Sequence, residues 1–292
     1  MKKLFVFMLI VLLCKISSAE VNVVTTTTVI YDIVKEIGKD KIKADYICRG
    51  DQDPHFLEIL PSYMMKLRKA DIVFKIGLDL EKWLPQLIDG SRNSSLVLVD
   101  LSINIEKKDV PTGKIDASRG DIHPSGNPHY WLDPENVKIM ASEICNTLSD
   151  FDPANAEYYK KNREQYIIKL DQKISDWMKV MQPLKGKDLI FFHSSWTYFT
   201  SRFGINTAGY VEPKPGIQPT PSHNAEIINI IKKKKIKMIV MENYYSANAP
   251  SQIADITGAT VVKVPVAVYG IDGINSYIEL MDYIINRLIQ NM

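Results

Sequence analysis

The hydrophobic and polar positions of the chain repeat an alternation of strand-like and helical segments. In the first half, apolar β-branched runs and segments with helical spacing follow one another as strand 22–28, helix 31–38, strand 43–47, helix 61–70, strand 71–76, helix 80–88 and strand 96–99. Strands that alternate with helices are typical of parallel βα units. The first half is therefore predicted to form one α/β lobe.

A long helical segment occupies the middle of the chain. An Asp-Pro pair at 152–153 supplies a cap and a first-turn proline, and residues 154–181 contain no Gly or Pro and keep apolar residues at helical spacing. At 1.5 Å per residue, such a helix would be roughly 42 Å long. We interpret residues 153–181 as a rigid helix that links two halves.

The alternation restarts after this helix. Strand-like runs at 188–192, 206–211, 237–241 and 260–264 alternate with helical patterns at 225–234, 251–257 and 276–289. The predicted fold class is therefore α/β, with two parallel-sheet lobes at 20–152 and 182–292 joined by the linking helix.

The first nineteen residues have the pattern of a secretory signal peptide. A basic start at Lys2 and Lys3 precedes an apolar run at 4–13, and Ser17 and Ala19 are small residues suited to cleavage. An alternative is lipid modification of Cys14, although bulky residues precede it. We expect cleavage after Ala19 and a periplasmic location, with no membrane-spanning segment in the mature chain.

Composition and charge exclude several partners. The chain is 46% hydrophobic and 24% charged, and removal of the three lysines in the signal leaves 33 basic and 34 acidic residues. This balance provides no strong field for nucleic acid or an anionic membrane, and we expect a monomer. The lysines at 232–235 are interpreted as a solvated helix end. Cys48 and Cys145 could pair after export, but we expect two small buried thiols.

Histidine is scarce, and its positions are informative. There are five histidines, and three of them follow strands or a long irregular loop: His55, His129 and His193. Ligands of open α/β sheets bind outside the carboxyl ends of the strands, so a site in the cleft between the lobes is expected. His123 is interpreted as an ordinary loop residue, and His223 as packing at a helix start.

Several motifs occur in a characteristic order. They are Asp-Pro-His-x-x-Glu-x-x-Pro-Ser at 53–62, Gly-Leu-x-Leu-Glu-x-Trp-Leu at 77–84, Asn-Pro-His-x-Trp-Leu-Asp-Pro at 127–134 and His-x-x-Trp at 193–196. With the signal peptide and the central helix, the chain resembles the zinc- and manganese-binding solute-binding proteins of bacterial ABC importers, particularly the zinc-uptake type. The resemblance implies a metal ion held between the lobes by His55, His129 and His193, and a membrane permease as partner.

The fourth ligand is left open by the sequence. Many members of that family supply an aspartate shortly after the strand that ends here near Val264, and no carboxylate stands there in this chain. Water, Glu242 or Asp272 are the alternatives. Three imidazoles suit zinc, whereas manganese prefers more oxygen ligands, so zinc is expected and manganese or iron is the alternative.

Other side chains would orient the histidine rings, and Asp53, Asp133 and Ser195 are candidates because they are near in sequence. The predicted function is capture of a divalent metal ion and its delivery to the permease, without enzymatic activity. The alternative is a secreted zinc hydrolase with the same three histidines and with Glu242 or Glu58 as base, but no His-Glu-x-x-His stretch accompanies them. The stiff linking helix predicts only modest lobe movement.

Overall fold

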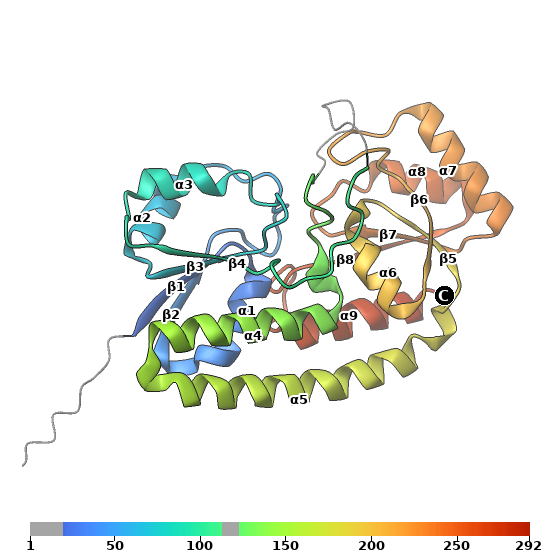
Figure 1. The fold of residues 1–292 in the computed structure, drawn as a ribbon. Helices are drawn as coiled ribbons and strands as arrows, with labels where there is room; N and C mark the ends of the chain where they lie inside the picture. Colours follow the sequence, from blue (N-terminus) through green and yellow to red (C-terminus); the bar gives the residue numbers. More distant parts are fainter. Residues whose placement is uncertain (1–19, 113–122) are drawn as a thin grey trace, which may run out of the picture.

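The computed structural model describes residues 20–112 and 123–292 and contains two four-stranded parallel sheets (Figure 1). The strand orders are β2-β1-β3-β4 and β6-β5-β7-β8, so the two sheets share one topology. Their strands are β1 (Val21–Thr25), β2 (Ile42–Tyr46), β3 (Ile72–Lys75), β4 (Val97–Asp100), β5 (Asp188–Phe191), β6 (Asn206–Tyr210), β7 (Met238–Glu242) and β8 (Thr260–Val264). The two parallel-sheet lobes predicted from the alternation are confirmed. The predicted signal peptide, with Cys14, lies outside the described residues.

Helices flank each sheet and lie beneath both. They are α1 (Thr28–Gly38), α2 (Pro61–Lys69), α3 (Leu84–Ser91), α4 (Pro134–Phe151), α5 (Ala156–Val180), α6 (Thr197–Phe203), α7 (Pro221–Lys234), α8 (Asn248–Thr257) and α9 (Tyr277–Gln290). Helix α5 has 25 residues and runs beneath both lobes. Its buried stripe, which includes Tyr159, Tyr166 and Trp177, follows the helical repeat and belongs to the main core. The long helix is thus confirmed, while the lobe boundaries at 152 and 182 stay predictions.

Most predicted elements lie within a few residues of their expected places, and α6 is the exception. The pattern Thr-Tyr-Phe-Thr-Ser-Arg-Phe at 197–203 is rich in residues with β-propensity, and no helix was expected there. Burial of Tyr198, Phe199 and Phe203 in the core favours the helix over this local preference. Gly204 ends α6 in the left-handed conformation at φ 68°, which glycine adopts without strain.

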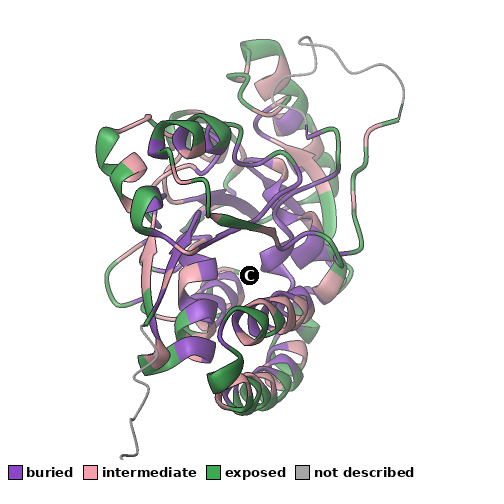
Figure 2. Cartoon of the chain, turned by 60° about the vertical axis from the view of Figure 1, so that its left-hand side comes forward, coloured by how far each residue is buried: buried purple, intermediate pink, exposed green. Residues whose placement is uncertain are grey.

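The two lobes are joined by more than α5. Residues 265–276, which connect β8 to α9 and are called here the junction segment, contact the first lobe. Thr28 donates its hydroxyl to the Val268 carbonyl at 2.6 Å, and the Trp131 indole donates to the Val266 carbonyl at 2.8 Å. A side chain at Gly50 would put Cβ only 2.1 Å from the Val268 carbonyl oxygen, so the backbones meet closely. One buried core continues from the first sheet to the second (Figure 2).

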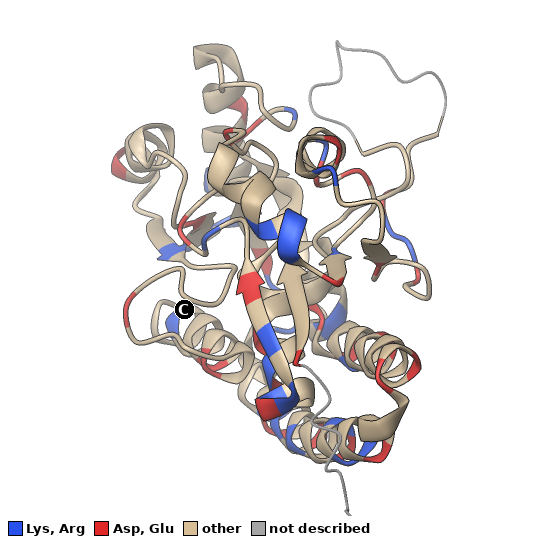
Figure 3. Cartoon of the chain, turned by 90° about the vertical axis from the view of Figure 1, so that its left-hand side faces the viewer, with Lys and Arg blue, Asp and Glu red and all other residues tan. Residues whose placement is uncertain are grey.

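Three smaller expectations can be compared with the structure. Cys48 and Cys145 are both buried free thiols, as expected. Acidic and basic residues are interspersed over the helices and strands (Figure 3), in accord with the near-zero net charge. Among the described helices, none combines the length and apolar character needed to span a bilayer.

Candidate metal centre

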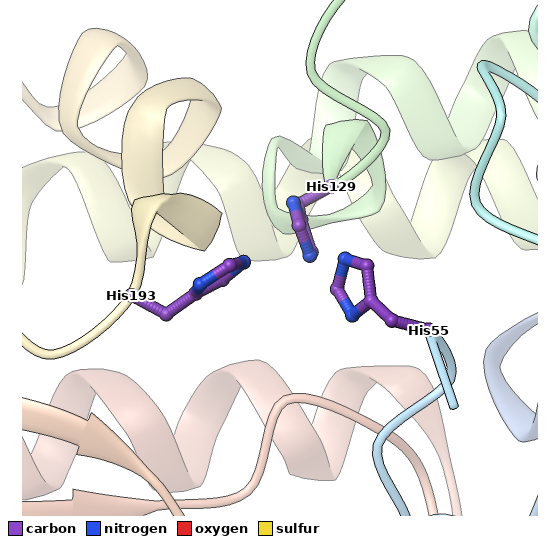
Figure 4. Close-up of side chains that lie close together, drawn as sticks. All are labelled: His55, His129 and His193. Atoms are coloured by element: carbon purple, nitrogen blue, oxygen red, sulfur yellow. The ribbon is translucent and has the colours of Figure 1, made fainter. Parts of the chain in front are cut away.

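Three histidines from distant parts of the chain converge between the lobes. His55 lies in the loop after β2, and His129 caps the short turn Tyr130–Leu132. His193 lies two residues after the end of β5 and precedes the turn Ser194–Trp196. One ring nitrogen of each lies within 4.8 Å of those of the other two, and all three residues are buried. Figure 4 shows the three rings facing a common centre. The convergence expected from the sequence is therefore present.

The spacing of the rings suits one shared ion. Their centroids are 5.0 Å apart for His55 and His129, 5.3 Å for His55 and His193, and 5.4 Å for His129 and His193. Two imidazoles bound through Nε2 to one tetrahedral zinc have centroids about 5 Å apart, given a Zn–N bond near 2.0–2.1 Å. The three Nε2 atoms are buried without a hydrogen-bond partner in the described part of the chain. Buried polar atoms of this kind need a partner, and a cation would satisfy all three.

The two histidines of the first lobe are oriented in the same way by the residue two positions earlier. Asp53 Oδ1 accepts from the His55 backbone at 3.0 Å and contacts its Nδ1 at 2.6 Å. Asn127 Oδ1 accepts from the His129 backbone at 3.0 Å and contacts its Nδ1 at 2.9 Å. Because these oxygens accept, Nδ1 carries the proton and the Nε2 lone pair is left for a ligand.

The third histidine is oriented from another strand. Glu212 Oε2 makes a short contact with His193 Nδ1, while its Oε1 accepts from the Gly216 backbone at 2.8 Å. Parallel pairing places Phe191 opposite Tyr210, so positions 193 and 212 leave the sheet side by side. Glu212 was missed from the sequence, although the adjacency of two strand ends was the signal that could have found it.

The environment makes the site suitable for a divalent cation. Burial and the neighbouring histidines hold the pKa of His129 well below its usual value, which keeps this ring neutral. Burial opposes ionisation of Asp53, but the bond to His55 holds the pKa of that carboxyl below its usual range. Asp53 and Glu212 place two carboxyl groups directly behind the rings of His55 and His193, an arrangement that favours a cation on the Nε2 side.

Two of the expected ring-orienting residues have other roles. Asp133 binds Arg202 through both carboxylate oxygens, at 2.7 and 2.9 Å, and accepts from the Glu135 backbone as the N-cap of α4. Ser195 donates its hydroxyl to Glu242 at 2.6 Å. Of the three candidates, only Asp53 contacts a site histidine, and the expectation for Asp133 and Ser195 is wrong.

The carboxylates considered for a fourth ligand lie outside the converging group. Glu242, at the end of β7, is fully buried, and burial raises its pKa to about 7. Its Oε1 accepts from the Ser195 hydroxyl at 2.6 Å and from the Trp196 indole at 3.0 Å. Asp272 is exposed in the junction segment. Neither is in the group of described residues whose atoms lie within 4.8 Å of one another.

The remaining histidines differ from each other. His223 lies at the start of α7, where its ring contacts the Tyr210 carbonyl at 2.9 Å, so the interpretation as helix-start packing is confirmed. His123 is buried, and its ring centroid lies 5.2 Å from that of His55. The structure thus places His123 beside the site, where the sequence had suggested an ordinary loop residue.

A pocket of about 490 Å³ adjoins the histidines on one side. His55 and His193 form part of its wall, together with Glu212, Asn224 and Tyr245. Phe56, at its edge, is 64% exposed. The site is therefore buried but lies next to a cavity that solvent-borne ions can enter.

Comparison with solved structures extends the fold assignment. The chain superposes on a crystal structure of ZnuA with a TM-score of 0.81 at 21% identity, covering 94% of this chain and 99% of that one. A Mn-bound periplasmic metal binding protein from Candidatus Liberibacter asiaticus gives a TM-score of 0.78 at 22% identity, with 93% and 99% covered. These likenesses show a shared fold.

Curated relatives and a family model identify the class. The metal ABC transporter substrate-binding lipoprotein ScbA of Streptococcus cristatus is 27% identical over 288 residues, covering 94% of this chain and 90% of its own. The manganese ABC transporter substrate-binding lipoprotein PsaA of Streptococcus mitis is 27% identical over 290 residues, with the same coverage. Fold, site and relatives define a substrate-binding protein of a metal ABC importer.

The family can be stated as well. Residues 23–291 match the family model described as ZnuA, zinc-uptake complex component A, periplasmic, and the chain belongs to this family. The resemblance stated from the motifs is confirmed, and the alternative of a secreted hydrolase with Glu242 or Glu58 as base is wrong, because family members are solute-binding proteins.

Proposed function

We propose that the protein captures zinc outside the cytoplasm, through His55, His129 and His193, and delivers it to its permease. The observation that carries this proposal is the donor set: three converging imidazole nitrogens, two of them on rings backed by carboxylates. Zinc is bound readily by three imidazoles with one position left for a further ligand. The proposal includes a monomer and lobe boundaries at 152 and 182. Water, Glu242 and Asp272 are the fourth ligands that the sequence leaves as alternatives.

Manganese is the second candidate, and a specific observation favours it. A relative from Streptococcus mitis is named a manganese ABC transporter substrate-binding lipoprotein, and one from Halalkalibacterium halodurans is named a manganese-binding lipoprotein. However, manganese prefers oxygen ligands, and the converging group in the described residues offers nitrogen only. This chemistry supports zinc over manganese, and over iron.

Attachment to the membrane is a separate question. Relatives such as ScbA are named lipoproteins, which supports the alternative of a lipid on Cys14. We expect cleavage after Ala19 and a mature protein that begins at Glu20. Mass spectrometry of the exported protein distinguishes the two, because a lipidated chain would begin at Cys14 and carry the added acyl mass.

Calorimetric titration of the metal-stripped protein tests the function. We expect one zinc ion per chain, bound more tightly than manganese or ferrous iron, and no measurable binding after replacement of His55, His129 and His193 by alanine. His223→Ala is the matched control, since this histidine lies outside the group and should leave binding unchanged. Undiminished binding in the triple variant would contradict the proposed site, and tighter binding of manganese would contradict the choice of zinc.

A further inference from the structure

We propose that His123 supplies the fourth ligand of the ion that the proposed function places between His55, His129 and His193. The inference rests on that function, and it concerns a residue to which neither the family motifs nor the sequence pattern assigned a role. It makes the complete donor set four imidazoles, with no carboxylate bound directly to the ion.

The position of His123 is the first support. It is 9% exposed, and its ring centroid lies 5.2 Å from that of His55, which is the same spacing as within the three-histidine group. Its centroid is 6.3 Å from that of His129, about 1 Å beyond the spacing of about 5 Å expected for two imidazoles on one tetrahedral zinc. His123 therefore stands beside the converging group rather than within it, and its ring would have to move toward His129 and His193 to bind the same ion.

The orientation of the ring is the second support. His123 Nδ1 lies 3.2 Å from the Asp79 carbonyl oxygen, which can only accept, so Nδ1 carries the proton. Nε2 then bears the lone pair, as it does in the three converging histidines. Asp79 also accepts from the Ser125 backbone at 3.2 Å, which ties the His123 segment to the loop before α3. Such contacts fix the ring in the state in which imidazole binds metals.

The competing carboxylates also lie outside the converging group. One oxygen of Glu242 already accepts two hydrogen bonds from the turn that follows His193, its other oxygen is buried without a hydrogen-bond partner in the described residues, and Asp272 is exposed. A fourth nitrogen also suits zinc better than manganese, which prefers carboxylate and water oxygens. We therefore expect His123 to contribute to discrimination between these metals as well as to affinity.

Cobalt substitution tests the inference, because the visible spectrum of Co²⁺ reports its donor atoms. In His123→Ala we expect one ion per chain still to bind, with a changed cobalt spectrum and with zinc affinity lowered about 10–100-fold, at least as much as loss of an outer-shell partner. Manganese affinity should change less. His223→Ala, which removes a histidine outside the group, should match the unmodified protein in all three measurements.

Other outcomes would overturn the inference. If the spectrum and the zinc affinity of His123→Ala equal those of the unmodified protein, His123 is not a ligand. If Glu242→Gln alters the spectrum and His123→Ala does not, the fourth ligand is the carboxylate. X-ray absorption of the zinc-loaded unmodified protein, which distinguishes four imidazoles from three, decides the matter even if a variant fails to fold. Absence of metal binding by the unmodified protein would contradict the proposed function instead.

Discussion

The two sides of the histidine site are built differently. On one side, the junction segment packs against the first lobe through buried backbone carbonyls that accept from Thr28 and Trp131. Tyr277, fully buried at the start of α9, donates its hydroxyl to the Trp131 carbonyl at 2.7 Å. On the other side lies the cavity of about 490 Å³, with the exposed Phe56 at its edge.

The first side therefore holds the lobes together, and the second side gives ions access to the site. Buried hydrogen bonds between the lobes are costly to break, because each broken bond leaves a polar group unsatisfied. Opening of the lobes about a hinge would break several of these interlobe hydrogen bonds at once. Movement of the side chains that line the cavity would leave the interlobe hydrogen bonds intact. We therefore expect ions to exchange on the cavity side while the lobes keep their relative position.

The largest expected effect comes from removing the Tyr277 side chain. Tyr277→Ala deletes a buried ring and its hydrogen bond and should lower the free energy of unfolding by about 3–5 kcal/mol, measured by denaturant titration. Tyr277→Phe keeps the ring and should cost only about 1 kcal/mol. Ile168→Ala, on the exposed face of α5, is the control and should stay within about 0.5 kcal/mol. A Tyr277→Ala protein as stable as this control would refute the supporting role of the buried contacts on this side of the site.

A second expected effect concerns Asp32, which lies on the same side of the site as Tyr277. Asp32 on α1 accepts from the Tyr277 backbone at 2.9 Å, and burial raises its pKa to about 7 from 3.8. Because the folded protein holds this proton more tightly than the unfolded chain, the stability that Asp32 contributes is fully present below about pH 4 and is lost as pH rises to about 7. The loss attributable to Asp32 is at most about 4 kcal/mol.

Asp32→Asn keeps an acceptor for the Tyr277 backbone and removes the charge. Free energies of unfolding measured across this pH range should therefore decline less in the variant than in the unmodified protein. Equal slopes in the two proteins would show that Asp32 is not the titrating group.

A third effect belongs to the cavity side. Glu212→Gln preserves the shape behind His193 but removes the negative charge, and we expect zinc affinity to fall about 10–100-fold by calorimetry. Glu226 is an exposed residue that contacts His223 outside the site. Glu226→Gln is therefore the matched control and should not alter zinc binding. If both variants bind zinc as the unmodified protein does, the charge behind His193 does not support the ion.

The smallest expected effect is on overall shape. Small-angle scattering profiles of the metal-free and zinc-loaded protein should coincide, because the junction holds the lobes together in both states. A clear decrease in the radius of gyration on zinc binding would show that the lobes close as rigid bodies. Ion exchange would then involve movement of the lobes and not only of side chains at the cavity.

Much of this architecture could be predicted from the sequence. Where prediction failed, there is a physical reason. Strand and helix periodicities are local, so both lobes and α5 could be predicted, as could Asp53 as the partner of the ring two residues later. Helix α6 could not, because burial of its aromatic side chains overrides local preference. Glu212 and the position of His123 depend on which strands and loops become neighbours, which periodicity does not encode.

The Asx-Pro-His tripeptides at 53–55 and 127–129 have a consequence for how the protein tolerates change. In each, one side-chain oxygen fixes the histidine backbone and ring within three residues. Flanking loops can therefore gain or lose residues without reorienting these two rings. The ring of His193 is instead oriented by Glu212, which follows the neighbouring strand β6. Insertions between residues 193 and 212 should therefore disturb the site more than insertions in the loops that flank the two tripeptides.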